Sequence, residues 1–407
     1  MAIRPPRTPS RSARSCAGSA RSWAPATSVR RLAAAWLVVA ALLTPACATH
    51  RVDEPTLRAD AHSEETALLP RVAVYDDPAL LAYLAQLGQR LGGAALPFHV
   101  LRDPTLSLFA LPDGHVFVHT GVLAVVENEA QLAAVLGHEL AHVFQRDALE
   151  IGEPRRVEPS LEGAAATSRT ASAIRALGLR LTARAAIIGY GRERERAADV
   201  TGLASVVRGG WDPKEAPVAF LRLAAQAFEG GPREVFFFGN RGRLSERIET
   251  TRALVASVFA AAAATPTTVR NSETFERLLP PVLRDNAYEE IRRSRFATAG
   301  RQLARVLAAT PSDLLAHVYV GDLHRLQAQR AGSADERAAE LAQARTAYER
   351  ALQGEGARPE AHRQLGLLYF ETNDPARARA EFEQYLALAP DAADARRIAE
   401  DVAELAR

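Results

Sequence analysis

The residues best suited to chemistry lie together in the pentapeptide His138-Glu139-Leu140-Ala141-His142. Residues four apart share one face of an α-helix, so His138 and His142 can direct two imidazoles at one metal ion. A catalytic zinc ion accepts imidazole nitrogens at about 2.0–2.1 Å and keeps one position for water. Glu139 is adjacent to the first histidine, where a carboxylate can take a proton from that water as it attacks a carbonyl. The alternative is a chance match on a buried helix.

A complete zinc site needs a third protein ligand. Glu195 is the candidate, because it lies on a second segment with helical spacing that could pack across the first helix. Asp199 follows four residues later and therefore shares its face, where it could accept a hydrogen bond from the outer nitrogen of a ligand imidazole. The alternative for this Arg- and Glu-rich segment is a solvated face with ion pairs, which describes Glu193 best.

The composition is that of a globular protein with two or three domains, since 48% of the 407 residues are hydrophobic and 24% are charged. The net charge of +2 becomes −5 once the seven arginines of residues 1–46 are set aside. A mildly acidic remainder gives no reason to expect a nucleic-acid partner. Both cysteines, Cys16 and Cys47, lie in the N-terminal segment, so a metal in the folded part must be held by His and carboxylate groups.

Residues 1–46 are predicted to be a signal peptide. They are basic, contain no acid, and end in an apolar run from Leu32 to Leu43 that is short for a membrane span. The sequence around Cys47 resembles a bacterial lipobox, so we expect a periplasmic protein with a candidate lipid anchor to a membrane at Cys47. Ordinary cleavage near Ala46 or Ala48 and an uncleaved anchor helix are the alternatives.

The next segments are expected to be a polar tether and then a folded domain over residues 71–264 that contains this candidate zinc site. Hydrophobic periodicity there predicts helices and short strands, while 150–170 lacks a clear period and indicates a loop. His115 and His119 share one face of a predicted strand, and we assign them to structure or to the rim of a cleft, not to the metal. The expected elements are a tether over 47–70, helices within 72–91, 127–150, 171–188 and 190–208, and strands at 98–101, 106–111 and 115–119.

Residues 265–285 are rich in Pro, Thr and Arg and are predicted to be a linker, and 286–407 are predicted to be helical repeats. Small and large apolar residues recur in the last repeat at the offsets of a 34-residue tetratricopeptide repeat, with generic helical hairpins as the alternative. The fold class is therefore α+β and mainly helical, with a small sheet in the first domain and an all-α second domain. The repeat positions are Gly366, Tyr369, Ala378, Phe382 and Pro390, with weaker units at Gly321, Ala344, Tyr348 and Ala351, and at Ala299, Leu303 and Val306.

Taken in order, these motifs resemble the zinc metallopeptidase family of HtpX, the prenyl-protein proteases and the periplasmic BepA-like proteins. The resemblance implies that His138, His142 and Glu195 bind one zinc ion per chain, with Glu139 as general base and Asp199 as partner of a ligand imidazole. It also implies that an extended peptide binds by strand addition beside the strand containing Val116 to Val118. The motifs span about residues 71–250 and comprise Phe109 to Gly114, Thr120-Gly121, Gly137 to His142, Glu195 to Asp199, and Gly210 to Pro213.

The chain departs from this family at two places. Relatives often carry His-Pro before the stretch Leu244-Ser245-Glu246-Arg247-Ile248, and a histidine plug on the metal is not expected here because Arg241-Gly242 takes its place. Ser107-Leu108 replaces the usual Asn-Ala before Phe109. The sequence predicts an exported zinc endopeptidase for misfolded or unassembled envelope proteins, with repeats that dock polypeptide substrates or envelope complexes. The alternative is a repeat-based chaperone or scaffold with an idle or regulatory metal site.

Overall fold

The structure is a computed structural model that describes residues 54–92, 95–147, 192–228, 241–266, 268–353, 356 and 358–405. The predictions for residues 1–46, for Cys47 and for the segments 150–170 and 171–188 lie outside these residues. Among the helices that are described, none has both the length and the apolar character needed to span a membrane.

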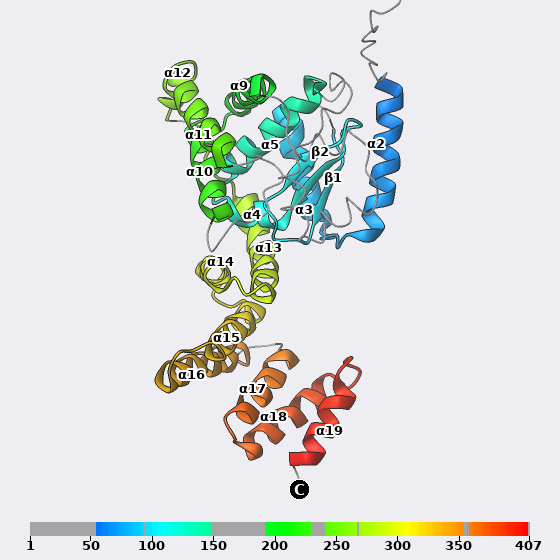
Figure 1. Cartoon of the computed structure of the whole chain (residues 1–407), viewed down its shortest axis with the longest axis vertical. Coiled ribbons are helices and arrows are strands. Elements are labelled where there is room, and N and C mark those ends of the chain that lie inside the picture. The colour runs from blue at the N-terminus through cyan, green and yellow to red at the C-terminus, as the bar shows by residue number, and fades with distance from the viewer. Residues whose placement is uncertain are drawn as a thin grey trace, which may run out of the picture. The chain divides into compact units, whose positions relative to one another are not determined.

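A three-stranded sheet forms the centre of the first part of the chain (Figure 1). Its strands are β1 (Phe98–Leu101), β2 (Leu108–Ala110) and β3 (Val116–His119), in the order β1-β3-β2. β3 pairs parallel with β1 and antiparallel with β2, and Gly114 takes a φ of 97° in the turn between β2 and β3. Only glycine adopts this φ without strain. The strands predicted at 98–101, 106–111 and 115–119 are confirmed.

The two faces of the sheet pack against different helices, because side chains alternate along a strand. Val100, Val116 and Val118 enter the main core together with residues of α5 (Glu129–Phe144). The opposite face carries Phe109 and Phe117, which pack beneath α2 (Glu54–Leu68). Figure 1 shows α2 and α5 on either side of the strands.

Helix α2 corrects the expectation of a tether over 47–70. Ala61 and Leu68 are fully or almost fully buried against Phe109 and Phe117, and the short 3-10 helix η1 (Leu69–Arg71) follows. This helix shows no apolar periodicity in the sequence, because it buries few apolar side chains. The polar residues Glu64 and Glu65 are buried on it as well.

Among the remaining helices that the structure describes in the first part, those within residues 72–91 and 190–208 were predicted and the others were not. Asp77 caps the first of them by accepting hydrogen bonds from the backbone N–H groups of Ala79 and Leu80. Asn128 caps α5 in the same way through Gln131. These helices are α3 (Pro78–Gly92), α4 (Thr120–Val125), α9 (Arg192–Arg208), α10 (Glu215–Phe228), α11 (Arg241–Ala256) and α12 (Ala260–Ala263).

Helix α13 (Glu273–Arg292) corrects the expectation of a linker over 265–285. Pro280 and Pro281 lie inside it, although each removes a helical hydrogen-bond donor. The helix buries Phe275, Leu279 and Val282 in the same core that begins at the sheet. Burial of this face outweighs the cost of the prolines, and composition alone could not reveal that balance.

The C-terminal part consists of paired helices, as predicted. Gly321 lies against the ring of Tyr348, and Gly366 against the ring of Phe382, so a larger residue at either glycine would displace a buried aromatic ring. This pairing of small and large residues is the repeat pattern predicted from the sequence. The helices are α14 (Phe296–Ala309), α15 (Leu314–Ala328), α16 (Ala334–Ala351), α17 (Pro359–Glu371), α18 (Pro375–Leu388) and α19 (Ala395–Leu405).

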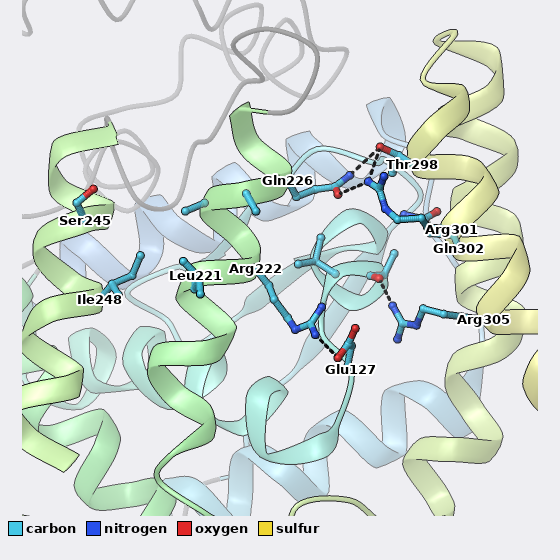
Figure 2. A pocket seen from close by; sticks show the side chains of 14 residues that line it. Glu127, Leu221, Arg222, Gln226, Ser245, Ile248, Thr298, Arg301, Gln302 and Arg305 are labelled. Carbon is cyan, nitrogen blue, oxygen red and sulfur yellow. Dashed lines mark hydrogen bonds and ion pairs between the residues drawn. The ribbon is translucent and has the colours of Figure 1, made fainter. Parts of the chain in front are cut away.

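The first repeat helices join the sheet-containing part through a shared hydrophobic core and through polar contacts. Arg305 of α14 donates hydrogen bonds to the carbonyl oxygens of Ala124 and Val126 at 2.7 and 2.8 Å. A cavity of about 790 Å³ lies beside these contacts, lined by α10, α11 and α14 (Figure 2). Its polar lining includes the Arg222–Glu127 ion pair. The core continues through this junction, so the domain limits 71–264 and 286–407 stay predictions.

Candidate active site

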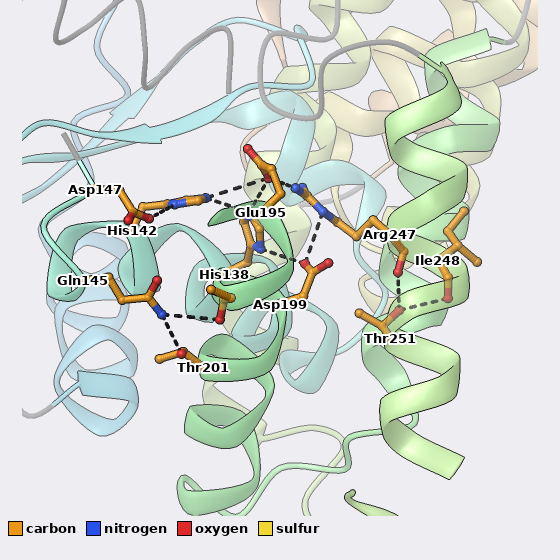
Figure 3. A network of polar contacts seen from close by, with 11 residues as sticks. His138, His142, Gln145, Asp147, Glu195, Asp199, Thr201, Arg247, Ile248 and Thr251 are labelled. Atoms are coloured by element: carbon orange, nitrogen blue, oxygen red, sulfur yellow. Dashed lines mark hydrogen bonds and ion pairs between the residues drawn. The ribbon is translucent and has the colours of Figure 1, made fainter. Parts of the chain in front are cut away.

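The three predicted metal ligands converge within a few ångströms (Figure 3). The Nε2 atoms of His138 and His142 are 3.2 Å apart, and Glu195 Oε2 lies 3.4 Å from the first and 3.9 Å from the second. Ligand atoms of a tetrahedral zinc ion are about 3.3 Å apart when each is about 2.0–2.1 Å from the metal. The donor set and its spacing therefore fit a divalent transition-metal ion.

Two glycines allow the helices that carry these ligands to cross closely. A Cβ atom added at Gly202 of α9 would lie only 2.8 Å from the backbone of Gly137 in α5. Glu195 and Asp199 precede Gly202 by seven and three residues, so they lie on the face of α9 that meets α5. Gly137 directly precedes His138. The crossing of α5 and α9 at the two glycines therefore determines how close the carboxylates of α9 come to the histidines of α5.

Each histidine has a carboxylate at its outer nitrogen. Asp199 Oδ1 lies 2.9 Å from His138 Nδ1, the position that the sequence predicted for this aspartate. Asp147 Oδ2 lies 2.6 Å from His142 Nδ1, and the sequence did not predict this contact. Such partners fix the tautomer and the ring orientation of a metal ligand.

A turn at the end of α5 places Asp147. Arg146 has a φ of 58°, in the left-handed region, and the chain reverses there so that Asp147 faces His142. Arg194 of α9 donates a hydrogen bond to the carbonyl oxygen of Asp147 at 2.8 Å, which fastens the turn to the second helix. No local motif marks this aspartate in the sequence, because its role depends on the turn and on α9.

Burial keeps His142 neutral. It lowers the pKa of His142, even though the hydrogen bond to Asp147 acts in the opposite direction. Neutral imidazole is the form that binds metal ions.

Glu139 directly follows His138 in α5, is 4% exposed, and is close enough to Glu195 for the two charges to interact. Burial raises its pKa well above the usual value, the charge of Glu195 adds to the rise, and Arg247 and a backbone hydrogen bond from Ala110 oppose it. A nearby cation would lower this pKa. The carboxyl group is thus easier to protonate than an exposed glutamate.

Arg247 of α11 reaches into the same site and was missed as a functional residue. Its guanidinium contacts Glu195 Oε2, the oxygen that also faces His138, and its Nε lies 3.2 Å from Asp199 Oδ1. Burial favours a higher pKa for Glu195, but the hydrogen bond with His138 and the charge of Arg247 hold it far below its usual range. Arg247 belongs to the Leu-Ser-Glu-Arg-Ile stretch, and this motif was the feature of the sequence that could have indicated its place in the site. The side chain of Arg241 lies outside the described part, so the absence of a plug stays a prediction.

The pairing of the sheet corrects the expected site of strand addition. β3, which contains Val116 to Val118, is the central strand and pairs with a neighbour on each side, so a peptide cannot be added beside it. β2 is the edge strand that packs on α5, and its Ala110 provides the backbone hydrogen bond to Glu139. The prediction of strand addition beside β3 is therefore wrong, because β3 is not an edge strand.

A helix that carries His-Glu-x-x-His, a second helix that supplies a glutamate and a small sheet beside them define a metallopeptidase domain of the zincin class, here followed by helical repeats. Residues 84–255 match peptidase family M48, and residues 332–403 match a tetratricopeptide repeat. The predicted resemblance, a peptidase M48 domain followed by a tetratricopeptide repeat, and the predicted fold class are confirmed.

The chain is similar to named proteases of bacteria and mitochondria. It is 31% identical over 195 residues to the putative beta-barrel assembly-enhancing protease of Vibrio cholerae, covering 44% of this chain and 40% of that protein. It is 29% identical over 175 residues to the beta-barrel assembly-enhancing protease of Escherichia coli K12, covering 39% and 36%. It is 34% identical over 139 residues to the mitochondrial metalloendopeptidase OMA1 of Schizosaccharomyces pombe, covering 34% and 40%. The chain thus matches about two fifths of the length of these relatives.

Proposed function

We propose that the chain is an exported zinc-dependent endopeptidase. The observation that carries the proposal is the compact group of His138, His142 and Glu195 with the buried carboxyl of Glu139 beside it. These three ligands would hold zinc, which when bound would polarise a water molecule and the substrate carbonyl. Asp199 and Asp147 would hold the two imidazoles in the tautomer that leaves Nε2 free to bind the metal.

Glu139 is the proposed general base. Glu139 would take a proton from the water molecule while the water oxygen attacks the peptide carbonyl carbon. It would then pass that proton to the leaving nitrogen as the C–N bond breaks. The raised pKa of Glu139 supports this role, because a carboxyl group that is easily protonated can both receive and return the proton.

An extended segment of polypeptide is the proposed substrate, added beside β2. The edge of β2 from Leu108 to Ala110 is short, so the backbone of the substrate would gain few hydrogen bonds there. The repeat helices are proposed to supply the missing affinity by docking substrates or partner complexes. The names of the bacterial relatives support misfolded or unassembled envelope proteins as the substrate class. A periplasmic location with a lipid anchor at Cys47 belongs to the same proposal.

A scaffold function with an idle metal site is the second candidate. It is favoured by one observation, that the guanidinium of Arg247 engages the same Glu195 oxygen that would bind the metal. An arginine in this position competes with a cation for the carboxylate. The buried Glu139 favours the enzyme, because a purely structural metal site has no need of a base.

The substitution Glu139→Gln tests the proposed function. It is expected to abolish cleavage of casein or of denatured protein while zinc content and the circular dichroism spectrum stay unchanged. Cleavage that persists at the wild-type rate would refute the role of Glu139.

Complementation of a deletion strain separates the enzyme from the scaffold. Glu139→Gln should be compared with removal of residues 357–407, which deletes α17 to α19 but spares the core that continues to Leu323. If only the truncation fails to complement, the scaffold function is correct.

A further inference from the structure

A second group of metal-binding side chains lies on the face of the sheet opposite α5. It consists of Glu65 from α2, His99 from β1, and His115 immediately before β3. Glu65 Oε1 is 3.5 Å from His99 Nε2 and 3.4 Å from His115 Nδ1, and the two nitrogens are 2.9 Å apart. These separations are as short as those among the three candidate ligands of the active site, and they match the edges of about 3.3 Å of a tetrahedral zinc site.

We propose that Glu65, His99 and His115 form a second binding site for a zinc-class cation, which fastens α2 to the sheet. Two imidazoles and one carboxylate are a donor set that suits zinc and its neighbours in the first transition row. This inference does not depend on the proposed peptidase activity. It changes the assignment of His115, which the sequence placed away from any metal, and it adds a second ion to the one expected per chain.

In the present structure the two imidazoles share a hydrogen bond. The rings are nearly coplanar, with 9° between their planes, so one ring nitrogen carries a proton that a cation would replace. Binding would turn the rings until both lone pairs meet at the ion, and the proton would move to the outer nitrogen of the donor ring.

Asp113 is positioned to support the metal-bound tautomer of His115. Its Oδ2 atom is buried and has no hydrogen-bond partner among the described residues, and it lies 4.0 Å from His115 Nε2. With Nδ1 bound to a cation, His115 carries its proton on Nε2, and a small rotation brings that proton to Asp113. The group thus repeats the carboxylate–histidine arrangement of the candidate active site.

His62 is the candidate for a fourth ligand. It precedes Glu65 by one turn of α2, and its Nδ1 lies 3.4 Å from Glu65 Oε2. Its side chain is 71% exposed, so it is free to turn toward an arriving ion, whereas the side chains of His99 and His115 are 20% exposed and stay accessible from solvent. A cation here would link α2 to two strands, where packing otherwise relies on few apolar side chains such as Ala61 and Leu68.

Zinc stoichiometry tests the proposal directly. The full-length protein is stripped with a chelator and titrated with Zn²⁺ alone. We expect about two equivalents for the wild type, about one for His99→Asn/His115→Asn, and about one for His138→Gln/His142→Gln. His317→Gln, in the repeats, is the matched control for loss of a histidine elsewhere and should keep about two.

Hydrogen exchange supplies a readout that does not depend on the active site. Zinc should slow exchange of the amides of residues 54–68 in the wild type and in His138→Gln/His142→Gln, but not in His99→Asn/His115→Asn. The single change Glu65→Gln should weaken this protection in the same way. This variant replaces His99→Asn/His115→Asn in the test if the double variant fails to fold.

A wild type that binds one equivalent, or a His99→Asn/His115→Asn variant that keeps two, would overturn the second site. Loss of binding in His317→Gln as well would mark the second equivalent as adventitious and would also overturn it. By contrast, a His138→Gln/His142→Gln variant that keeps the wild-type stoichiometry would count against the proposed active site and leave the second site standing.

Discussion

The crossing of α5 and α9 gives a quantitative test of how the candidate site is held together. In Gly202→Ala the new Cβ would lie 2.8 Å from Gly137 and from the backbone nitrogen of His138, so backbone atoms, not flexible side chains, must move apart. Separation by about 0.7 Å or more is needed to restore van der Waals contact. Overpacking of this kind costs about 1–3 kcal/mol, against a gain of about 0.5–1 kcal/mol from the better helix propensity of alanine. We expect a net loss of about 0–2.5 kcal/mol in the free energy of unfolding.

The same movement should affect metal binding and activity more than stability. It carries Glu195 and Asp199 away from His138, and a misplacement of about 1 Å can cost about 100-fold in rate. Urea unfolding, zinc competition with a chromophoric chelator and casein cleavage measure the three effects. Gly300→Ala is the matched control, since its Cβ would make only an ordinary 3.5 Å contact with Leu323. It should be neutral or stabilising. Equal stability changes in the two variants, with unchanged zinc affinity in Gly202→Ala, would refute the reasoning.

Two further substitutions address single contacts. Asp147→Asn removes the carboxylate charge at His142 and should weaken zinc binding by about 10–100-fold, with little change in stability; an unchanged affinity would show that the contact does not tune the ligand. Burial raises the pKa of Asp322 to about 6, although its hydrogen bond from Tyr348 opposes the rise. Because this folded-state value exceeds the unfolded one, Asp322 contributes stability below about pH 4 that is lost as the pH rises through about 6, an effect of about 2–3 kcal/mol at most. Asp322→Asn should therefore be more stable than the wild type at pH 7 and similar to it at pH 4, as measured by denaturant unfolding, and a difference independent of pH would contradict this account.

Helices α2 and α13 show where reasoning from sequence failed on the fold. Both were expected to be connecting segments, and both are helices that pack on the core. α2 carries too few buried apolar residues to show a helical period, and α13 contains Pro280 and Pro281, which argue against a helix when they are judged locally. In each case the surface that the helix covers decides its structure, and that surface is formed by residues far away in the chain.

The sequence by itself determined the resemblance to this peptidase family, the mainly helical α+β fold class and the group of candidate ligands. This was sufficient because the information is local: His138 and His142 share a face through helix geometry alone, and Glu195 and Asp199 do so on a second helix. Tertiary structure alone decided that β2 is an edge strand and β3 the central one, that Asp147 and Arg247 reach the site, and that Glu65, His99 and His115 meet behind the sheet. These contacts join separate elements, so they depend on strand order, on the left-handed turn at Arg146 and on helix packing, which no spacing along the chain encodes.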